Sequence, residues 1–287
     1  MMTEAAGFLV GAALLFWRMR WEMGAIELNH HTVTLERKSL ASPLRILHLS
    51  DIHFAGPDPA IARFFDELAV EHYDLVVISG DILDCPKGLP ECAENLRKLR
   101  ARNGIFAVLG NHDYFDYGFV DVLFHNFPGQ SRPRRLQATH ALVRVLEEAG
   151  VRVLRNETVD LTCGGTPVQI HGLDDATIGR ANVRTAMARY DPSRINLLLS
   201  HNLDVFLDIG RDEIDLAFSG HTHGGQFRLP WFGPLYTHTR TGRRYACGIH
   251  KLKGAVCCVS RGMGCGRSVP FRLLCRPEAV VLTVCGS

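Results

Sequence analysis

Five apolar stretches of this 287-residue chain each end at a short polar cluster that contains His, Asp or Asn. The clusters follow one another as Ser50–His53, Gly80–Asp84, Gly110–Asp113, Ser200–Asn202 and Gly220–His223. In open α/β sheets, the loops that carry ligand-binding residues lie at the carboxyl ends of the strands. A glycine beside such a residue lets the backbone turn sharply and approach closely. The pattern therefore predicts one polar site, assembled at a common edge of a buried sheet.

The first half of the chain alternates expected strands with expected helices. Strands are predicted at Leu44–Ser50, Asp74–Ser79 and Ile105–Leu109, with helices at Ala60–Glu71 and Pro90–Ala101 between them. Strands that are apolar throughout, alternating with helices, indicate an α/β sheet that is covered on both faces.

The rest of the chain reads as further strands with one helix. The expected elements are a half-buried strand in Ile26–Leu40, a helix at His140–Ala149, strands within Val151–Val159 and Pro167–His171, strands ending at Ser200 and Ser219, and β structure at Tyr245–Gly248, Ala255–Ser260 and Ala279–Val284. No internal repeat or linker interrupts this order. A single domain over residues 24–287 is therefore predicted, after an N-terminal segment of residues 1–23.

The N-terminal segment resembles a membrane anchor. Ala5–Trp17 contains no charged residue and is followed by Arg18, Arg20 and Trp21. Thirteen helical residues reach ~20 Å, short of the ~30 Å hydrocarbon core, so a short span and an in-plane helix both stay open. Basic residues after the run predict an inner-membrane protein whose catalytic part faces the cytoplasm. The alternative is a core helix of a soluble cytoplasmic protein.

The charged residues narrow the class of partner, and the cysteines indicate the redox compartment. The net charge of +2 makes nucleic acid an improbable partner. Between Arg228 and Arg276, however, there are ten Lys or Arg residues and no acidic residue, which favours phosphate esters or an acidic lipid surface over a merely solvated basic face. The nine cysteines contain no CxxC pair, as expected for free thiols in a reducing compartment.

In their order, the five clusters read D-x-H, G-D, G-N-H-D, H and G-H-x-H. From Leu44 to His223 the chain thereby resembles the calcineurin-like metallophosphoesterase superfamily. The resemblance implies an α/β fold with a central β-sandwich flanked by helices (αββα) and a metal site at the strand ends. It also implies two metal-ligand sets that share Asp81: Asp51, His53, Asp81 and His223 for one ion, and Asp81, Asn111, His201 and His221 for the other.

These residue types suit two-metal hydrolysis. A bridging carboxylate holds two cations ~4 Å apart, where they share a hydroxide and clamp a phosphoryl oxygen. Imidazole and carboxylate ligands without thiolate favour Mn, Fe or Zn. The resemblance assigns His112 to bind a phosphoryl oxygen and protonate the leaving alkoxide, with Asp84 orienting its ring.

A closer resemblance, to the bacterial YkuE/YaeI-type subgroup, is carried by Gly220–Gln226, Ser260–Gly264 and Pro277-Glu278. It implies a membrane-associated enzyme that hydrolyses a phosphodiester or a pyrophosphate; a related branch acts on UDP-2,3-diacylglucosamine. For such a lipid-linked substrate, Arg240, Arg243 and Arg244 are the predicted contacts to the head group.

Other functions stay open at this stage. The enzymatic alternative is a soluble phosphomonoesterase or a protein phosphatase. The non-enzymatic one is a metal-poor adaptor scaffold, although that function normally requires lost ligands and none is missing here. The sequence makes no prediction of the oligomeric state.

Overall fold

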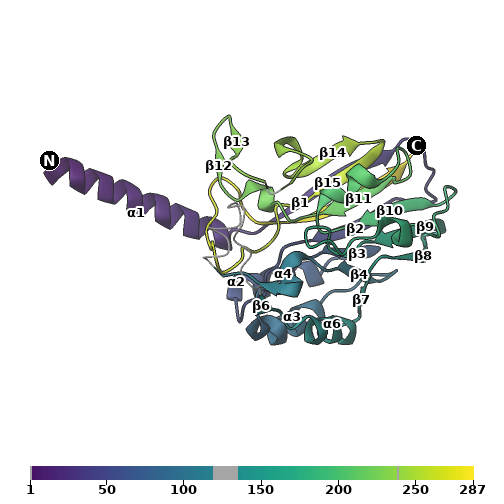
Figure 1. Cartoon of the computed structure of the whole chain (residues 1–287), viewed down its shortest axis with the longest axis horizontal. Coiled ribbons are helices and arrows are strands. Elements are labelled where there is room, and N and C mark those ends of the chain that lie inside the picture. The colour runs from purple at the N-terminus through teal and green to yellow at the C-terminus, as the bar shows by residue number, and fades with distance from the viewer. Residues whose placement is uncertain (1, 119–134, 238) are drawn as a thin grey trace.

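A computed structural model of the chain describes residues 2–118, 135–237 and 239–287, so residues 119–134 of the predicted domain lie outside the described part. Two six-stranded sheets form the body (Figure 1). The strand order of the first is β1 (Glu27–Leu35), β16 (Glu278–Gly286), β2 (Leu44–Leu49), β3 (Leu75–Ser79), β4 (Ile105–Val108) and β7 (Val151–Val153). That of the second is β14 (Gly248–Leu252), β15 (Ala255–Val259), β11 (Leu216–Ser219), β10 (Ile195–Leu199), β9 (Thr166–Gly172) and β8 (Glu157–Cys163).

Helices cover the outer faces of the two sheets. The first sheet is covered by α2 (Pro59–Ala69), α3 (Leu89–Leu96) and α6 (Thr139–Glu148), and α7 (Val183–Ala186) and the 3₁₀ turn η2 (Leu203–Asp208) cover the second. The shorter elements are η1 (Pro86–Gly88), α4 (Asn111–Tyr114), β5 (Phe115–Asp116), β6 (Arg135–Leu136), η3 (His223–Gly225), β12 (Arg228–Leu229), β13 (Gly233–Pro234) and η4 (Arg243–Tyr245). The predicted αββα sandwich is confirmed.

The core consists of one apolar layer between the sheets and one beneath each set of helices. Ile46 and Val77 of the first sheet share the inner layer with Leu197 of the second. On β15, Cys258 points into this inner layer, whereas Cys257 packs with the outer layer of the second sheet. Adjacent strand residues thus pack on opposite faces, as the pleat requires.

Parallel pairing brings the carboxyl ends of the strands to one edge. The strands β2, β3 and β4 are parallel neighbours, and Leu49 lies opposite Ile78 in their register. In the second sheet β10 is parallel to β11. The polar residues that follow these five strands are therefore delivered to the same end of the sandwich.

The predicted elements differ from the structure in several places, among them α3, which ends at Leu96 and not at the predicted Ala101. The stretch Tyr245–Gly248 was expected to be β, and that prediction is wrong, because η4 occupies Arg243–Tyr245 and β14 begins only at Gly248. Gly242 has a positive φ of 97°, which a regular strand excludes, and η4 follows it directly; Gly248, with a φ of 98°, then begins β14. The strand β1 ends at Leu35, five residues before the predicted limit.

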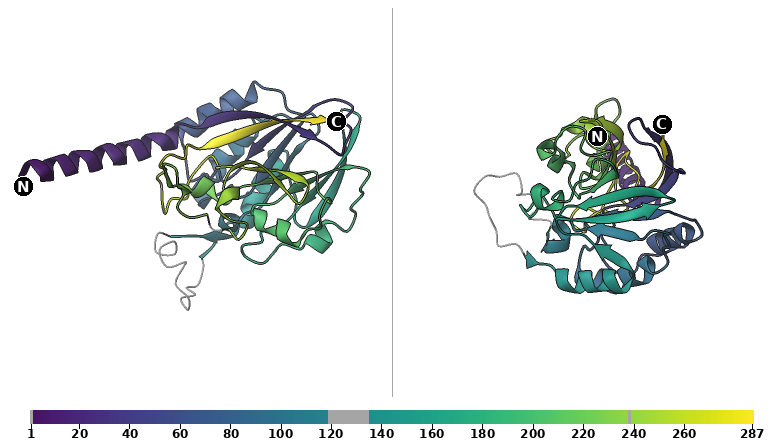
Figure 2. Two further views of the ribbon diagram at one scale, coloured as in Figure 1. Left: turned by 90° about the horizontal axis from the view of Figure 1, so that it is seen from above. Right: turned by 90° about the vertical axis from the view of Figure 1, so that its right-hand side faces the viewer.

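Helix α1 (Met2–Gly24) projects from one end of the body (Figures 1 and 2). Its last turns are docked: Glu22 is buried and accepts a hydrogen bond from the Cys275 backbone N–H at 3.3 Å, and the ring of Phe16 lies 5.3 Å from that of Phe271. No helix in the described residues combines the length and the apolar content that crossing a membrane requires. The exposed apolar side chains of α1 include Leu9, Val10, Leu14, Leu15 and Trp17.

Candidate metal centre

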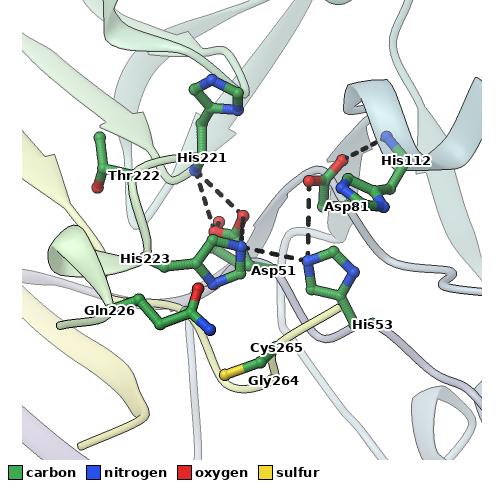
Figure 3. A network of polar contacts seen from close by, with 12 residues as sticks. Asp51, His53, Asp81, His112, His221, Thr222, His223, Gln226, Gly264 and Cys265 are labelled. Atoms are coloured by element: carbon green, nitrogen blue, oxygen red, sulfur yellow. Dashed lines mark hydrogen bonds and ion pairs between the residues drawn. The ribbon is translucent and has the colours of Figure 1, made fainter. Parts of the chain in front are cut away.

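The five polar clusters meet at the carboxyl edge of both sheets. Figure 3 shows Asp51, His53, Asp81, His112, His221 and His223 gathered there. Asp51, Asp81, His201 and His221 each lie two residues beyond the end of their strand, and Asn111, the first residue of α4, lies three residues beyond the end of β4. His53 and His223 follow two residues after Asp51 and His221. All seven predicted metal ligands are therefore positioned by strand ends, four from the first sheet and three from the second.

Backbone conformation singles out the same residues. The φ angles are 47° at Asp51, 54° at His53, 49° at Asp81, 68° at His221 and 49° at His223. Left-handed φ values are uncommon for residues with a Cβ, and each costs about 1–3 kcal/mol. Such strain persists where the surrounding structure requires it, and it clusters at functional sites.

The first group of potential ligand atoms comprises Asp51, His53, Asp81 and His223, whose atoms all lie within 4.8 Å of one another. The Nε2 atoms of His53 and His223 are 3.3 Å apart. His223 Nε2 lies 3.6 Å from Asp51 Oδ1, and His53 Nε2 lies 3.8 Å from Asp81 Oδ2. The arrangement gathers two imidazoles and two carboxylates around one point.

The second group comprises Asp81, His201 and His221. His201 Nε2 is 3.3 Å from Asp81 Oδ2 and 3.1 Å from His221 Nδ1. Asn111 is buried, and its Oδ1 has no hydrogen-bond partner among the described residues. Asp81 belongs to both groups, as expected for a bridging carboxylate.

The chemistry of these donors fits a cation. His201 Nδ1 donates to the carbonyl oxygen of Ser79 at 2.8 Å, so in the neutral ring Nε2 carries a lone pair directed at Asp81 and His221. Burial alone would raise the pKa of Asp81, but the neighbouring His201 charge lowers it well below its usual value. Burial would lower the pKa of His201, and Asp81 raises it well above 6.5. Positive charge is therefore stabilised between these groups, where a metal ion would supply it.

His112 and Asp84 lie beside this centre. The backbone N–H of His112 donates to Asp81 Oδ1 at 2.8 Å, and burial lowers the pKa of its ring to about 4. Asp84 Oδ1 is 4.0 Å from His112 Nδ1 and 3.7 Å from His53 Nδ1, so this carboxylate lies between the two rings. The His112 side chain is 18% exposed and that of His53 only 1%, so His112 is the one of the two that faces outward.

Two arginines near the site have no counterpart in the sequence prediction. Arg272 is fully buried; its Nη2 donates to the carbonyl oxygens of Arg261 and Gly264 and lies 3.4 Å from His223 Nδ1. Arg267 donates from Nε to Asp84 Oδ2 at 2.5 Å. Both residues fall in the acid-free segment, but only the fold reveals which of its ten basic residues reach the site.

The three arginines that were predicted to bind substrate contact neighbouring residues of the chain, and their role toward a substrate stays a prediction. Arg240 pairs with Asp204, with Nε 3.8 Å from Oδ2. Arg243 Nη2 donates to the carbonyl oxygen of Phe232 at 2.8 Å, and Arg244 lies over the ring of Tyr245. His171, in β9, is buried and hydrogen-bonded through Nε2 to Asn196 at 2.9 Å.

Gly110 illustrates how closely the loops pack around Asp81. The Asp113 carboxylate accepts hydrogen bonds from the backbone N–H groups of Gly110, Ile82 and Leu83, which ties the second and third clusters together. A Cβ added at Gly110 would lie 2.3 Å from Asp81 Oδ1, although its φ of −107° suits any residue. The constraint at this position is therefore steric and not conformational.

We expect Gly110→Ala to lower the free energy of unfolding by about 1–3 kcal/mol, the usual cost of overpacking, and to reduce the bound Mn²⁺. Urea denaturation and metal analysis measure the two effects. Gly7→Ala is the matched control, because nothing lies within 4 Å of its added Cβ. Unchanged stability and metal content in Gly110→Ala would contradict the close packing of this loop against Asp81.

Comparison with known proteins shows which family and which relatives this chain resembles. The family model for calcineurin-like phosphoesterases matches residues 44–225. The chain is 32% identical to the uncharacterized metallophosphoesterase YkuE of Bacillus subtilis, over 98% of this chain and 93% of that protein. It is 28% identical to the phosphodiesterase YaeI of Escherichia coli (91% and 89%), and 26% identical to the UDP-2,3-diacylglucosamine pyrophosphatase LpxG of Chlamydia trachomatis (84% and 83%).

Proposed function

Since the chain belongs to the calcineurin-like phosphoesterase family and is a phosphoester hydrolase, we propose that it works with two divalent metal ions and acts on a lipid-linked substrate. The observation that carries this proposal is the pair of ligand groups that share Asp81 at the carboxyl edge of the two sheets. Asp51, His53 and His223 complete the site for one ion, and Asn111, His201 and His221 complete the site for the other. When bound, the ions supply Lewis acidity toward a phosphoryl oxygen and an activated water.

The protein's own groups perform the remaining steps. His112 binds a phosphoryl oxygen of the substrate, whose negative charge favours the protonated ring that burial alone disfavours, and donates a proton to the leaving oxygen. Its backbone bond to Asp81 fixes its distance from the centre, and the adjacent Asp84 carboxylate orients its ring. The Arg267 bond to Asp84 restrains that carboxylate in turn.

The substrate is a phosphodiester or a diphosphate that is attached to a lipid. The named activities of the relatives YaeI and LpxG support this class, because the two proteins are called a phosphodiesterase and a UDP-2,3-diacylglucosamine pyrophosphatase. Helix α1 supports the lipid part, because seven large apolar side chains are exposed along its described residues. We place the protein on the cytoplasmic face of the inner membrane, attached through α1.

The test is a comparison of three substrates with one preparation. The chelated protein is reloaded with Mn²⁺, Zn²⁺ or Fe²⁺ and given a phosphomonoester, a phosphodiester and UDP-2,3-diacylglucosamine. We expect no turnover before reloading and the highest kcat/KM on a diester or a diphosphate. Full activity in the chelated protein would contradict the metal proposal, and a preference for the monoester would contradict the substrate class.

Removing the exposed part of α1 should separate membrane binding from catalysis. The deletion should span residues 2–15 and keep Phe16 and Glu22, since both contact the segment 271–275. We expect the full chain to sediment with membranes and the shortened chain to stay in the supernatant, with unchanged hydrolysis of a small water-soluble ester. Activity on a lipid-linked ester should fall, because confinement to the membrane raises the effective concentration. A shortened chain that still sediments would show that α1 is not the sole attachment.

A further inference from the structure

The hairpin formed by β12 and β13 exposes large apolar side chains at its tip. Trp231 is 100% exposed and Phe232 is 75% exposed. The flanking residues Leu229, Leu235 and Tyr236 are also exposed. Scattered single apolar residues are normal on a surface, but a contiguous group marks a contact site for a protein or a membrane.

The structure holds this hairpin away from the body. Its base is fixed by backbone hydrogen bonds from Arg228 to Leu273 at 3.0 Å and from Leu235 to Phe227 at 3.1 Å. At the tip, Arg243 donates to the carbonyl oxygen of Phe232 at 2.8 Å, which places a guanidinium group beside the two aromatic residues. Trp231 itself adopts a left-handed φ of 63°. The fold therefore accepts both an uncommon backbone conformation and full exposure of the indole.

The hairpin and α1 are joined through one short segment. Gln226, two residues before β12, donates from Nε2 to the carbonyl oxygen of Phe271 at 2.9 Å. The ring of Phe271 lies against Phe16 of α1. Figure 1 accordingly shows β12 and β13 at the same end of the body as the base of α1.

The charges around this end of the molecule favour an anionic bilayer as the partner of the hairpin. The acid-free stretch 228–276 contains the hairpin, and Arg18 and Arg20 lie on α1 between the exposed Trp17 and Trp21. Arg20 Nη1 donates to the carbonyl oxygen of Pro270 in the joining segment. Tryptophan and phenylalanine beside arginines match the boundary of an anionic bilayer, where the rings enter the acyl edge and the guanidinium groups meet lipid phosphates.

We propose that residues 228–236 form a second membrane-contacting element, which inserts Trp231 and Phe232 into the interface of an anionic bilayer while Arg243 binds lipid phosphate. From the proposed function, this inference takes only that the protein binds a membrane. It does not depend on catalysis. Four residues separate His223 from Arg228, so insertion would also set the orientation of the metal centre relative to the membrane.

The three tryptophans of the chain allow a direct test. In full-length protein with Trp17→Phe and Trp21→Phe, Trp231 is the only tryptophan. We expect its emission to shift to shorter wavelength on vesicles containing phosphatidylglycerol, to be quenched by brominated acyl chains, and to change less on vesicles of phosphatidylcholine alone. Emission that stays constant while the protein cosediments with the vesicles would overturn the proposal. A blue shift that needs only higher protein concentration would also overturn it, since a second copy would then cover the hairpin.

A double variant of the hairpin and a control variant measure how much the hairpin contributes to vesicle affinity. Trp231→Ala with Phe232→Ala should weaken vesicle binding by about tenfold, the effect of withdrawing one to two partly buried aromatic rings. Val70→Ala is the matched control, because Val70 is 79% exposed but precedes β3, at the opposite end of the strands from the metal centre. Hydrolysis of a water-soluble ester should be unchanged in both proteins, so a failed metal proposal and a failed hairpin proposal give different results. Equal vesicle affinity in the hairpin variant and the control would overturn the inference.

Discussion

Asp81→Asn should reduce phosphoester hydrolysis by about 10³-fold or more, because Lewis acid catalysis by bound metal ions contributes several kcal/mol. Asp81 is the one residue that belongs to both ligand groups. The substitution keeps the shape of the side chain and an oxygen that accepts from the His112 N–H. What it removes is the negative charge that two cations would share. Metal content, measured by mass spectrometry, should fall from two ions per chain.

A control for this variant is Asp66→Asn, which changes an exposed carboxylate of α2 that pairs with Lys98, just after α3. Its activity and metal content should equal those of the unmodified protein. Near-normal turnover with two bound ions in Asp81→Asn would rule out the bridging role, whatever the control does.

His112→Ala should retain both metal ions and lose about 10²–10⁴-fold in rate, the usual contribution of a general acid. The His112 ring belongs to neither ligand set that shares Asp81, although its ring lies close to Asp84 and His53 in a third cluster of potential ligand atoms. The loss should be small for a p-nitrophenyl ester, whose leaving group needs little protonation, and large for an alkyl ester. Rates for the two esters with each protein measure this difference.

The exposed His140 at the start of α6 offers a matched histidine control, and His140→Ala should leave both rates unchanged. An equal loss for good and poor leaving groups in His112→Ala would assign His112 to phosphate binding alone. Loss of metal would instead place its ring among the ligands.

The sequence predicted the strand ends of the site well, because local rules act there. An apolar strand, a glycine and a polar residue occur within a few positions, and parallel pairing then fixes where Asp51 and Asp81 meet. The close contact of Gly110 with Asp81 follows from the same loops.

The supporting residues were missed because they come from distant parts of the chain. Arg272 reaches His223 across 49 positions, and Arg267 reaches Asp84 across 183. No spacing or periodicity links such pairs. For the same reason the basic segment alone could not distinguish Arg267, which meets the site, from Arg243, which meets the hairpin tip.

The division of the predicted ligands between two sheets has a consequence for how the protein is assembled. The first sheet supplies Asp51, His53, Asp81 and Asn111, and the second supplies the three remaining histidines. Neither sheet contains a complete set for either ion, so no full site exists until the two sheets have docked. Folding must therefore come before metal uptake, and each ion that then binds favours the docked state by mass action. Metal supplied during refolding should raise the yield by slowing separation of the sheets rather than by speeding their formation.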